Sequence, residues 1–264
     1  SIPVEEGAPL RDWAAFEDYQ APEALATDDW GEPIDWNAMR EHFARVKEQG
    51  GLAVGAIAHG FMYMRLFYLR GFTNLMIDIG TRDPRLDRLI DMVASRNERL
   101  VKELLAAGAE MISGGDDLGM QTSLPMRPDD WRRYIKPAYA RIFADCREGG
   151  VPVYLHSDGH IFEIIPDLVD CGITIINPQI RANGLEGLVK YAKGRVAIHI
   201  DLDRQLFPFA TPERIKAHVR EVFEALYKPE GGLMLHAECG PDIPLENIEA
   251  ICEALEEVGG GPWM

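Results

Sequence analysis

The stretch VPVYLHSDGHIFEIIPDL (residues 151–168) indicates the fold and raises the question of function. It begins as an apolar run of strand length, ends in a polar sequence from His156 to His160, and continues with the apolar spacing of a helix. His156 and Asp158 are two residues apart, so they share one face of an extended strand with Tyr154. Such side chains at the end of a buried strand are candidate metal ligands or proton carriers.

The same strand-then-helix pattern occurs six times along the chain. Each strand candidate is a nearly continuous apolar run, which is typical of strands buried on both faces of a parallel sheet. No glycine-rich dinucleotide-binding sequence follows the first strand, which disfavours a Rossmann domain. The sequence therefore predicts a TIM-type (β/α)8 barrel. The strand candidates span residues 52–58, 109–115, 152–157, 173–177, 195–200 and 232–236.

We expect one barrel domain over residues 1–264. Residues 1–37 are rich in Pro, Asp, Glu and Trp and have little periodicity, so we expect an irregular surface segment there. Only six units follow, and a complete barrel needs eight. We therefore expect two further strands upstream of Ser1.

Composition and charge limit the classes of partner. The 264 residues are 47% hydrophobic, enough for a sizeable core, and carry a formal net charge of -16. This charge, without a Lys/Arg cluster, disfavours nucleic acid and anionic membrane surfaces as partners. No apolar run approaches the roughly 18 residues that cross a bilayer, and no signal peptide is visible. The four cysteines show no CxxC or disulfide-framework spacing, so we expect free thiols and a cytoplasmic location.

Side chains that bind metals or carry protons follow every strand candidate. In a (β/α)8 barrel the active site lies at the carboxyl ends of the strands, so these side chains are expected to meet. Each one alone has an ordinary alternative: Asp116 and Asp117 can form a turn, and His199 can be a hydrogen-bonded core histidine. The set comprises His59, Asp116, Asp117, His156, Asp158, Asn177, Gln179, His199, Asp201, Asp203, His236, Glu238 and Cys239.

A metal site is the sharpest hypothesis from these residues. His156, Asp158 and Cys239 would bring an imidazole, a carboxylate and a thiolate together from two strand ends. This donor set suits Zn²⁺ with one position left open, and such an ion would polarise a bound thiol, alcohol or water. The alternative is that Cys239 is an ordinary cysteine in a solvated loop.

Five segments in chain order resemble the uroporphyrinogen decarboxylase superfamily, which also contains the cobamide-dependent methyltransferases. The similarity runs from about Leu10 to Leu255. The methyltransferase branch binds zinc through His-x-Cys and a distant second Cys, which the resemblance assigns to His156, Asp158 and Cys239. The segments are GAIAHGFMYMRLFYLRGFTNLMIDI, GGDDLGMQTSLPMRPDDWRRYIKPAYARIF, VPVYLHSDGHIFEIIPDLVDCGITIINPQ, HIDLDRQLFPFATPERIKAHV and LMLHAECGPDIPLENIEAICEAL.

Asp158 departs from the family pattern, which has a cysteine at this position. A carboxylate in place of a thiolate makes a harder site, which favours a substrate bound through oxygen. The same change is compatible with a metal site that has been lost.

The resemblance implies an enzyme closer to the methyltransferase branch than to the decarboxylases. It would move a methyl group from a small methylated compound, an O-methyl donor, to a corrinoid on a partner protein, with zinc as its own metal. Asp116, Asp117 and Asp203 would then be catalytic. A metal-free decarboxylase and a non-catalytic barrel relative remain alternatives, and a homodimer is compatible with the family. The expected substrate-binding residues are His59, Gln121, Asn177, Gln179, His199 and His236.

Overall fold

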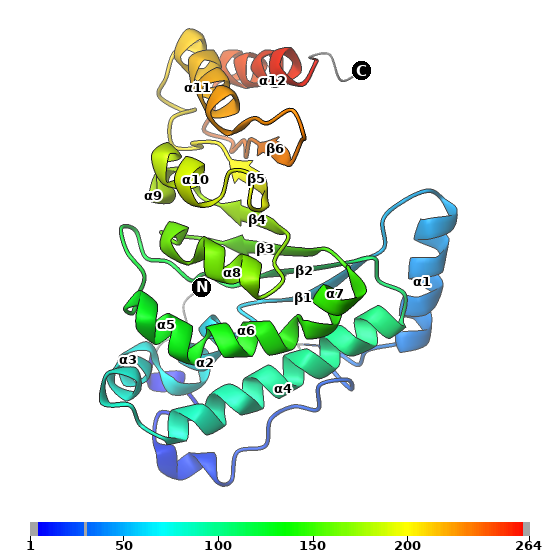
Figure 1. Ribbon diagram of the computed structural model, residues 1–264, viewed down its shortest axis with the longest axis vertical. Helices are drawn as coiled ribbons and strands as arrows, with labels where there is room; N and C mark the ends of the chain where they lie inside the picture. The colour runs from blue at the N-terminus through cyan, green and yellow to red at the C-terminus, as the bar shows by residue number, and fades with distance from the viewer. Residues whose placement is uncertain (1–4, 29–30, 261–264) are drawn as a thin grey trace.

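A computed structural model describes residues 5–28 and 31–260, which form a parallel α/β structure (Figure 1). Six parallel strands make one sheet in the order β1-β2-β3-β4-β5-β6. Each strand therefore pairs with the next one along the chain, as in a (β/α)8 barrel. The described part of the chain leaves this sheet open between β6 and β1, so it forms part of a barrel. The strands are β1 (Val54–His59), β2 (Met111–Gly115), β3 (Val153–Ser157), β4 (Ile175–Pro178), β5 (Ala197–Asp201) and β6 (Leu233–His236).

The limits of these strands differ from the predicted ranges by no more than two residues. Burial on both faces, however, is found in β4 but not in β3 or β5. In β3, Leu155 is buried whereas Tyr154 and His156 on the opposite face are only half-buried. The same alternation occurs in β5, where Ile198 is buried and His199 is half-buried. Because the sheet is not closed, one face of β3 and β5 is only partly removed from water, whereas in β4 the consecutive residues Ile176, Asn177 and Pro178 are all buried.

Most of the helices in the described ranges lie beside one another along the sheet, whereas α1 (Trp36–Glu48) stands apart from them (Figure 1). The others are α2 (Tyr63–Arg70), α3 (Phe72–Thr81), α4 (Arg85–Ala106), α5 (Pro128–Tyr134), α6 (Lys136–Ile142), α7 (Ala144–Gly149), α8 (Ile165–Asp170), α9 (Ile180–Asn183), α10 (Leu185–Tyr191), α11 (Pro212–Leu226) and α12 (Leu245–Gly259). Helix α4 packs on β1 and α6, α6 on α8, α10 on α11, and α11 on α12. In Figure 1, α11 and α12 lie beside β6, at the opposite end of the sheet from α4.

Local signals in the sequence explain where several helices begin. The side chain of Asp83 accepts a hydrogen bond from the backbone N–H of Arg85 at 2.9 Å, at the start of α4. Pro128 opens α5, and the break between α5 and α6 lies two residues before Pro137.

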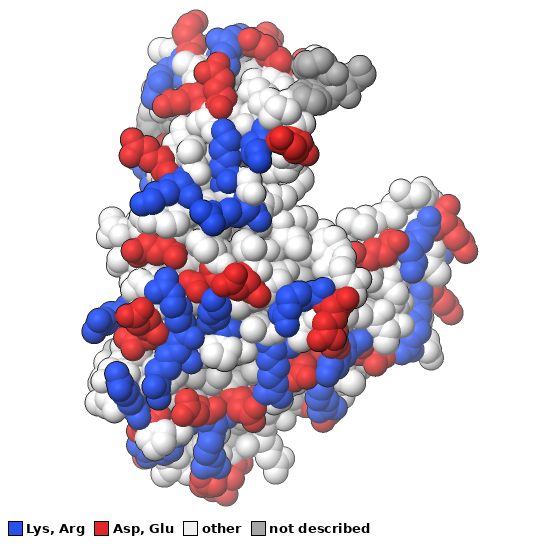
Figure 2. All heavy atoms as spheres, in the orientation of Figure 1, with Lys and Arg blue, Asp and Glu red and all other residues white. Residues whose placement is uncertain are grey.

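No helix in the described ranges is long and apolar enough to cross a bilayer. Figure 2 shows basic and acidic side chains interspersed over the visible face.

The N-terminal segment is irregular, as expected, but it is not confined to the surface. Leu10 is fully buried, and Trp13 donates a hydrogen bond to the carboxylate of Asp78 on α3. Buried Arg70 on α2 binds Asp78 at 2.7 Å and the carbonyl of Leu10 at 2.9 Å. The segment therefore completes the environment of a buried ion pair, which needs these partners to remain charged. Residues 1–4 and 29–30 of the predicted segment lie outside the described residues.

Candidate metal centre

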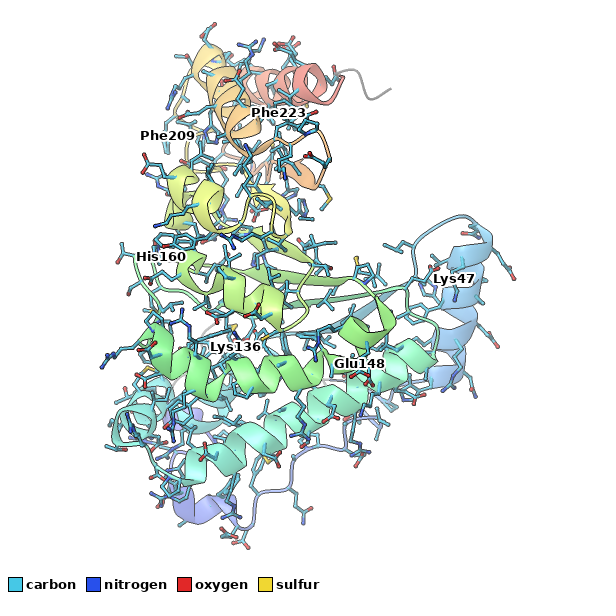
Figure 3. All side chains as sticks on the ribbon, viewed as in Figure 1. Lys47, Lys136, Glu148, His160, Phe209 and Phe223 are labelled. Carbon is cyan, nitrogen blue, oxygen red and sulfur yellow. The ribbon has the colours of Figure 1, made fainter. Side chains whose placement is uncertain are left out.

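The predicted site residues gather at the carboxyl edge of the sheet. In Figure 3, His160, which follows β3, and Phe209, which follows β5, lie on the left. Lys47, which precedes β1, lies on the right. Because all six strands run parallel, the left edge in this view is the edge at which every strand ends.

Three side chains from two neighbouring strand ends form a group that could hold a metal ion. Asp117, His156 and Asp158 each offer one ligand atom, and these atoms all lie within 4.8 Å of one another. His156 Nε2 is 3.3 Å from Asp158 Oδ1 and 3.9 Å from Asp117 Oδ1. All three side chains are half-buried, which leaves room for a further ligand from solvent or substrate. Residues 5–28 and 31–260 contain no second group of three such donors.

The donor set fits a divalent metal. One neutral imidazole and two carboxylates are ligands that Zn²⁺, Mn²⁺ and Fe²⁺ accept, and three protein ligands leave positions open, as catalytic sites require. The predicted pair of His156 and Asp158 is thus brought together, but Cys239 does not join it. Cys239 is exposed in the loop after β6, three strands away from β3, which carries His156. Asp117 takes the third position because it follows β2, the direct neighbour of β3.

Asn177 fixes which nitrogen of His156 faces the two carboxylates. The Asn177 Nδ2 donates to the carbonyl of His199 at 2.6 Å and to Asp201 Oδ1 at 3.0 Å. Both partners are acceptors, so the amide nitrogen must lie on this side. The Asn177 Oδ1 is then 2.6 Å from His156 Nδ1, which must carry a hydrogen. His156 Nε2 is left to bind a proton or a metal, and a hydrogen bond to the other ring nitrogen is typical of metal-binding histidines.

His156 and Asp158 shift each other's pKa values. The hydrogen bond to Asp158 raises the pKa of His156 to about 9, assisted by the bond to Asn177 and opposed by burial. The same bond lowers the pKa of Asp158 below its usual value. The metal-free site at neutral pH is therefore an imidazolium beside the carboxylate of Asp158, and a metal has to displace the proton on Nε2.

His59 is a further neighbour of the group. Its Nε2 lies 3.2 Å from Asp117 Oδ2, and its ring centroid is 5.8 Å from that of His156. Gly115 makes room for this ring, because a Cβ atom at position 115 would lie 2.4 Å from His59 Nδ1. His59 can therefore orient Asp117 or act as a fourth donor.

Asp116 is turned away from this group. It is fully buried and accepts hydrogen bonds from the backbone N–H groups of Tyr63 (2.7 Å) and Met64 (2.9 Å) and from the Tyr139 hydroxyl (2.7 Å). Burial raises the pKa of Asp116 to about 6. Its position holds the first turn of α2 against the end of β2, as an acidic group at a helix N-terminus does. A catalytic role for Asp116 stays a prediction.

The remaining predicted residues fall into two sets. At the ends of β5 and β6, His236 Nδ1 lies 3.0 Å from Asp201 Oδ1, and His199 Nδ1 lies 3.0 Å from the Tyr154 hydroxyl. The other four have loop positions, and among them Glu238 forms an ion pair with Arg204. Gln179 Oε1 accepts from the N–H of Gly159 at 3.0 Å, Asp203 Oδ1 lies 3.4 Å from Arg181, and Gln121 is exposed after β2.

Arg204 was missed in the sequence. It lies in the loop after β5, forms an ion pair with Glu238, and its charge contributes to the low pKa of Asp158. A lone arginine beside acidic strand ends is the signal that could have identified it.

Together, the fold and the site define a parallel α/β protein of the barrel type with its polar chemistry at the carboxyl edge of the strands. The family described as "Uroporphyrinogen decarboxylase (URO-D)" matches residues 21–258, so the chain belongs to this enzyme family. This confirms the resemblance found in the sequence.

Named relatives agree with this assignment. A uroporphyrinogen decarboxylase of Thermus thermophilus is 26% identical over 181 residues, which are 65% of this chain and 48% of the relative. One from Geobacillus thermodenitrificans is 39% identical over 72 residues, 27% of this chain and 19% of the relative. The chain thus spans about half the length of the Thermus relative.

Two solved structures share the fold. A methyltransferase from Methanosarcina mazei has a TM-score of 0.59 at 21% identity, covering 84% of this chain and 64% of that one. A B12-independent methionine synthase from Shewanella sp. W3-18-1 has a TM-score of 0.53 at 14% identity, covering 86% and 66%. At these identities the comparison establishes the barrel-type architecture.

Proposed function

We propose that this chain contains the metal-binding half of a methyltransferase that moves a methyl group from a small O-methyl compound to a corrinoid on a partner protein. The observation that carries the proposal is the group formed by Asp117, His156 and Asp158 at the carboxyl edge of the sheet. The fold shared with a protein named as a methyltransferase is consistent with this activity.

Each residue of the group has a distinct part in binding. Asp117, His156 and Asp158 would hold the metal, and Asn177 keeps His156 Nε2 directed toward the two carboxylates. When bound, the metal supplies a Lewis acid that polarises the oxygen of the methyl donor. Two carboxylates make this a hard site, which favours an ether or alcohol oxygen over a thiol. His59 holds Asp117 through the contact of 3.2 Å between His59 Nε2 and Asp117 Oδ2.

The charge at this edge supports a neutral or cationic substrate. Asp117, Asp158 and Asp201 are acidic, while each of the nearby cations Arg181 and Arg204 already contacts a carboxylate. An acidic edge repels a ligand with several carboxylates. Decarboxylation of a tetrapyrrole acid is the second candidate, favoured by the names of the curated relatives. Such an enzyme would need its cationic contacts from residues beyond this edge.

A methyl-transfer assay tests the proposal. The full-length protein is mixed with cob(I)alamin and a panel of methyl ethers, methanol, methylamines and methyl thioethers, and the visible spectrum is followed. We expect methylation of the corrinoid with an oxygen-bound donor, and its loss in His156→Ala but not in His42→Ala, a control on exposed α1. Decarboxylation of uroporphyrinogen with no methyl transfer from any donor would contradict the proposal.

A further inference from the structure

A second group of hydrogen-bonded side chains lies at the same edge of the sheet, at the ends of β5 and β6. Asp201 is the last residue of β5 and His236 the last of β6, and the sheet register sets their Cα atoms opposite each other. His236 Nδ1 is 3.0 Å from Asp201 Oδ1. Neither residue is part of the group formed by Asp117, His156 and Asp158. Within the described ranges the pair has no third metal-binding side chain close enough to share an ion with it, so we do not interpret it as a metal site.

Asp201 determines which nitrogen of His236 is free to react. An ionised carboxylate only accepts hydrogen bonds, so His236 Nδ1 carries the hydrogen in this contact. Asp201 is itself held in place, because Oδ1 also accepts from Nδ2 of buried Asn177 at 3.0 Å. No hydrogen bond to another described residue engages His236 Nε2, and the side chain is 49% exposed. This nitrogen can therefore meet a substrate and exchange protons with solvent.

The neighbouring histidine lacks these properties. His199 Nδ1 is bonded to the Tyr154 hydroxyl at 3.0 Å, and its ring lies 5.5 Å from that of His236 between centroids. Burial lowers the pKa of His199 and raises that of Tyr154 to about 12, so both stay neutral near pH 7. Neither is suited to deliver a proton there, whereas a histidine bonded to a carboxylate is the usual arrangement for general acid–base catalysis.

Asn177 joins this pair to the metal donors. Its Oδ1 binds His156 and its Nδ2 binds Asp201, so the two groups belong to one hydrogen-bonded array on the same edge. The metal donors at the ends of β2 and β3 and the pair at the ends of β5 and β6 are therefore connected through Asn177 of β4, which lies between them.

We propose that Asp201 and His236 form the acid–base pair of this site and that His236 Nε2–H protonates the oxygen that loses its methyl group. The inference rests on the proposed function. In the step, the bond between oxygen and the methyl carbon breaks and its electron pair stays on oxygen. The electron pair of the Co(I) corrinoid forms the new bond to carbon, so cobalt becomes formally Co(III). The proton passes from His236 Nε2 to the oxygen, and solvent then returns a proton to the half-exposed ring.

Asp201 is a positioning residue in this step. It keeps the hydrogen on Nδ1 and stabilises the positive charge of the protonated imidazole. An acid of this kind matters most when the leaving oxygen is strongly basic, and general acid–base groups contribute roughly 100-fold or more to rate. The proposal therefore predicts that the rate of methyl transfer depends on the basicity of the leaving oxygen as well as on His236 and Asp201.

The test uses the metal-loaded full-length protein with cob(I)alamin and two donors, an alkyl methyl ether and an aryl methyl ether. We expect His236→Ala to slow transfer from the alkyl ether roughly 100-fold, with much less effect on the aryl ether, whose phenolate leaves without a proton. Added imidazole should restore part of the lost rate. Metal content should match the wild type, and His42→Ala should transfer at the wild-type rate with both donors.

A second measurement does not depend on activity. In ¹⁵N NMR spectra of the metal-free protein, neutral His236 should carry its hydrogen on Nδ1, and Asp201→Asn should weaken this preference. An Nε2–H tautomer in the wild type, or equal losses with both donors and no rescue by imidazole, would overturn the inference. A wild type that transfers no methyl group at all would refute the proposed function; active wild type with an unaffected His236→Ala would refute only the acid–base pair.

Discussion

His156 on β3 and Asn177 on β4 are direct partners in the sheet register, and their side chains meet with 2.6 Å between Nδ1 and Oδ1. This contact gives the imidazole one orientation and leaves Nε2 for the two carboxylates. The orientation is built into the sheet rather than into a loop, so the site is prepared before any ligand binds.

The first prediction concerns Asn177. Asn177→Ala removes the group that orients His156, so affinity for Zn²⁺ should fall by roughly 10- to 100-fold. Isothermal titration of the chelator-treated protein measures this. Asn37→Ala, on the exposed face of α1, is the matched control and should bind as tightly as the wild type. Equal affinity in Asn177→Ala and the control would show that the contact does not prepare the site.

The second prediction concerns the pKa of His156. In the metal-free protein the pKa of His156 should be about 9. Asp158→Asn should lower this pKa, because it removes the carboxylate whose hydrogen bond contributes most to raising it. NMR titration of the imidazole measures both values. Because the folded-state pKa is above the usual value of 6.5, the contribution of His156 to stability is complete below about pH 6.5 and is lost as pH rises through 9. Urea unfolding at several pH values should show this loss in the wild type and less of it in Asp158→Asn.

The third prediction concerns Asp116. Asp116→Ala leaves two backbone N–H groups and the Tyr139 hydroxyl without their acceptor in a buried place, so unfolding free energy should fall by about 3 kcal/mol or more. Tyr139→Phe removes one of these bonds and should lower it by only about 1 kcal/mol. Similar small losses for both variants would mean that Asp116 does not hold α2 to the sheet.

The fourth prediction concerns Gly159. This residue has φ of +81°, and a Cβ atom would lie 2.2 Å from the carbonyl oxygen of Gly119. Gly159→Ala should therefore destabilise the protein by about 2 kcal/mol or more and disturb the adjacent Asp158. Gly80→Ala has open space in α3 and should be neutral or stabilising by up to about 1 kcal/mol. Thermal unfolding of the two variants distinguishes them; a stable Gly159→Ala would contradict the close approach of the two loops.

Much of the fold could be predicted because strand and helix signals are local. The apolar run before His156 acts within a few residues, and it forms a strand where expected. The burial of Leu10 could not be predicted, because it depends on the distant ion pair of Arg70 and Asp78.

The candidate site was predictable only in part, because some of its contacts join residues that are distant in the sequence. His156 and Asp158 share a strand end, so their proximity follows from spacing alone. The third donor depends on which strand lies next to β3 and on how the backbone turns after β2. Both are tertiary properties, and they favour Asp117 over Cys239. Asp116, one residue away, points into the core instead.

Metal content of purified variants tests the central claim most directly. The protein is loaded with Zn²⁺, desalted and analysed for bound metal as wild type, Asp117→Ala, His156→Ala and Cys239→Ser. We predict about one ion per chain in the wild type and in Cys239→Ser, and loss of the ion in the other two. Retention of zinc in Asp117→Ala together with its loss in Cys239→Ser would contradict the account.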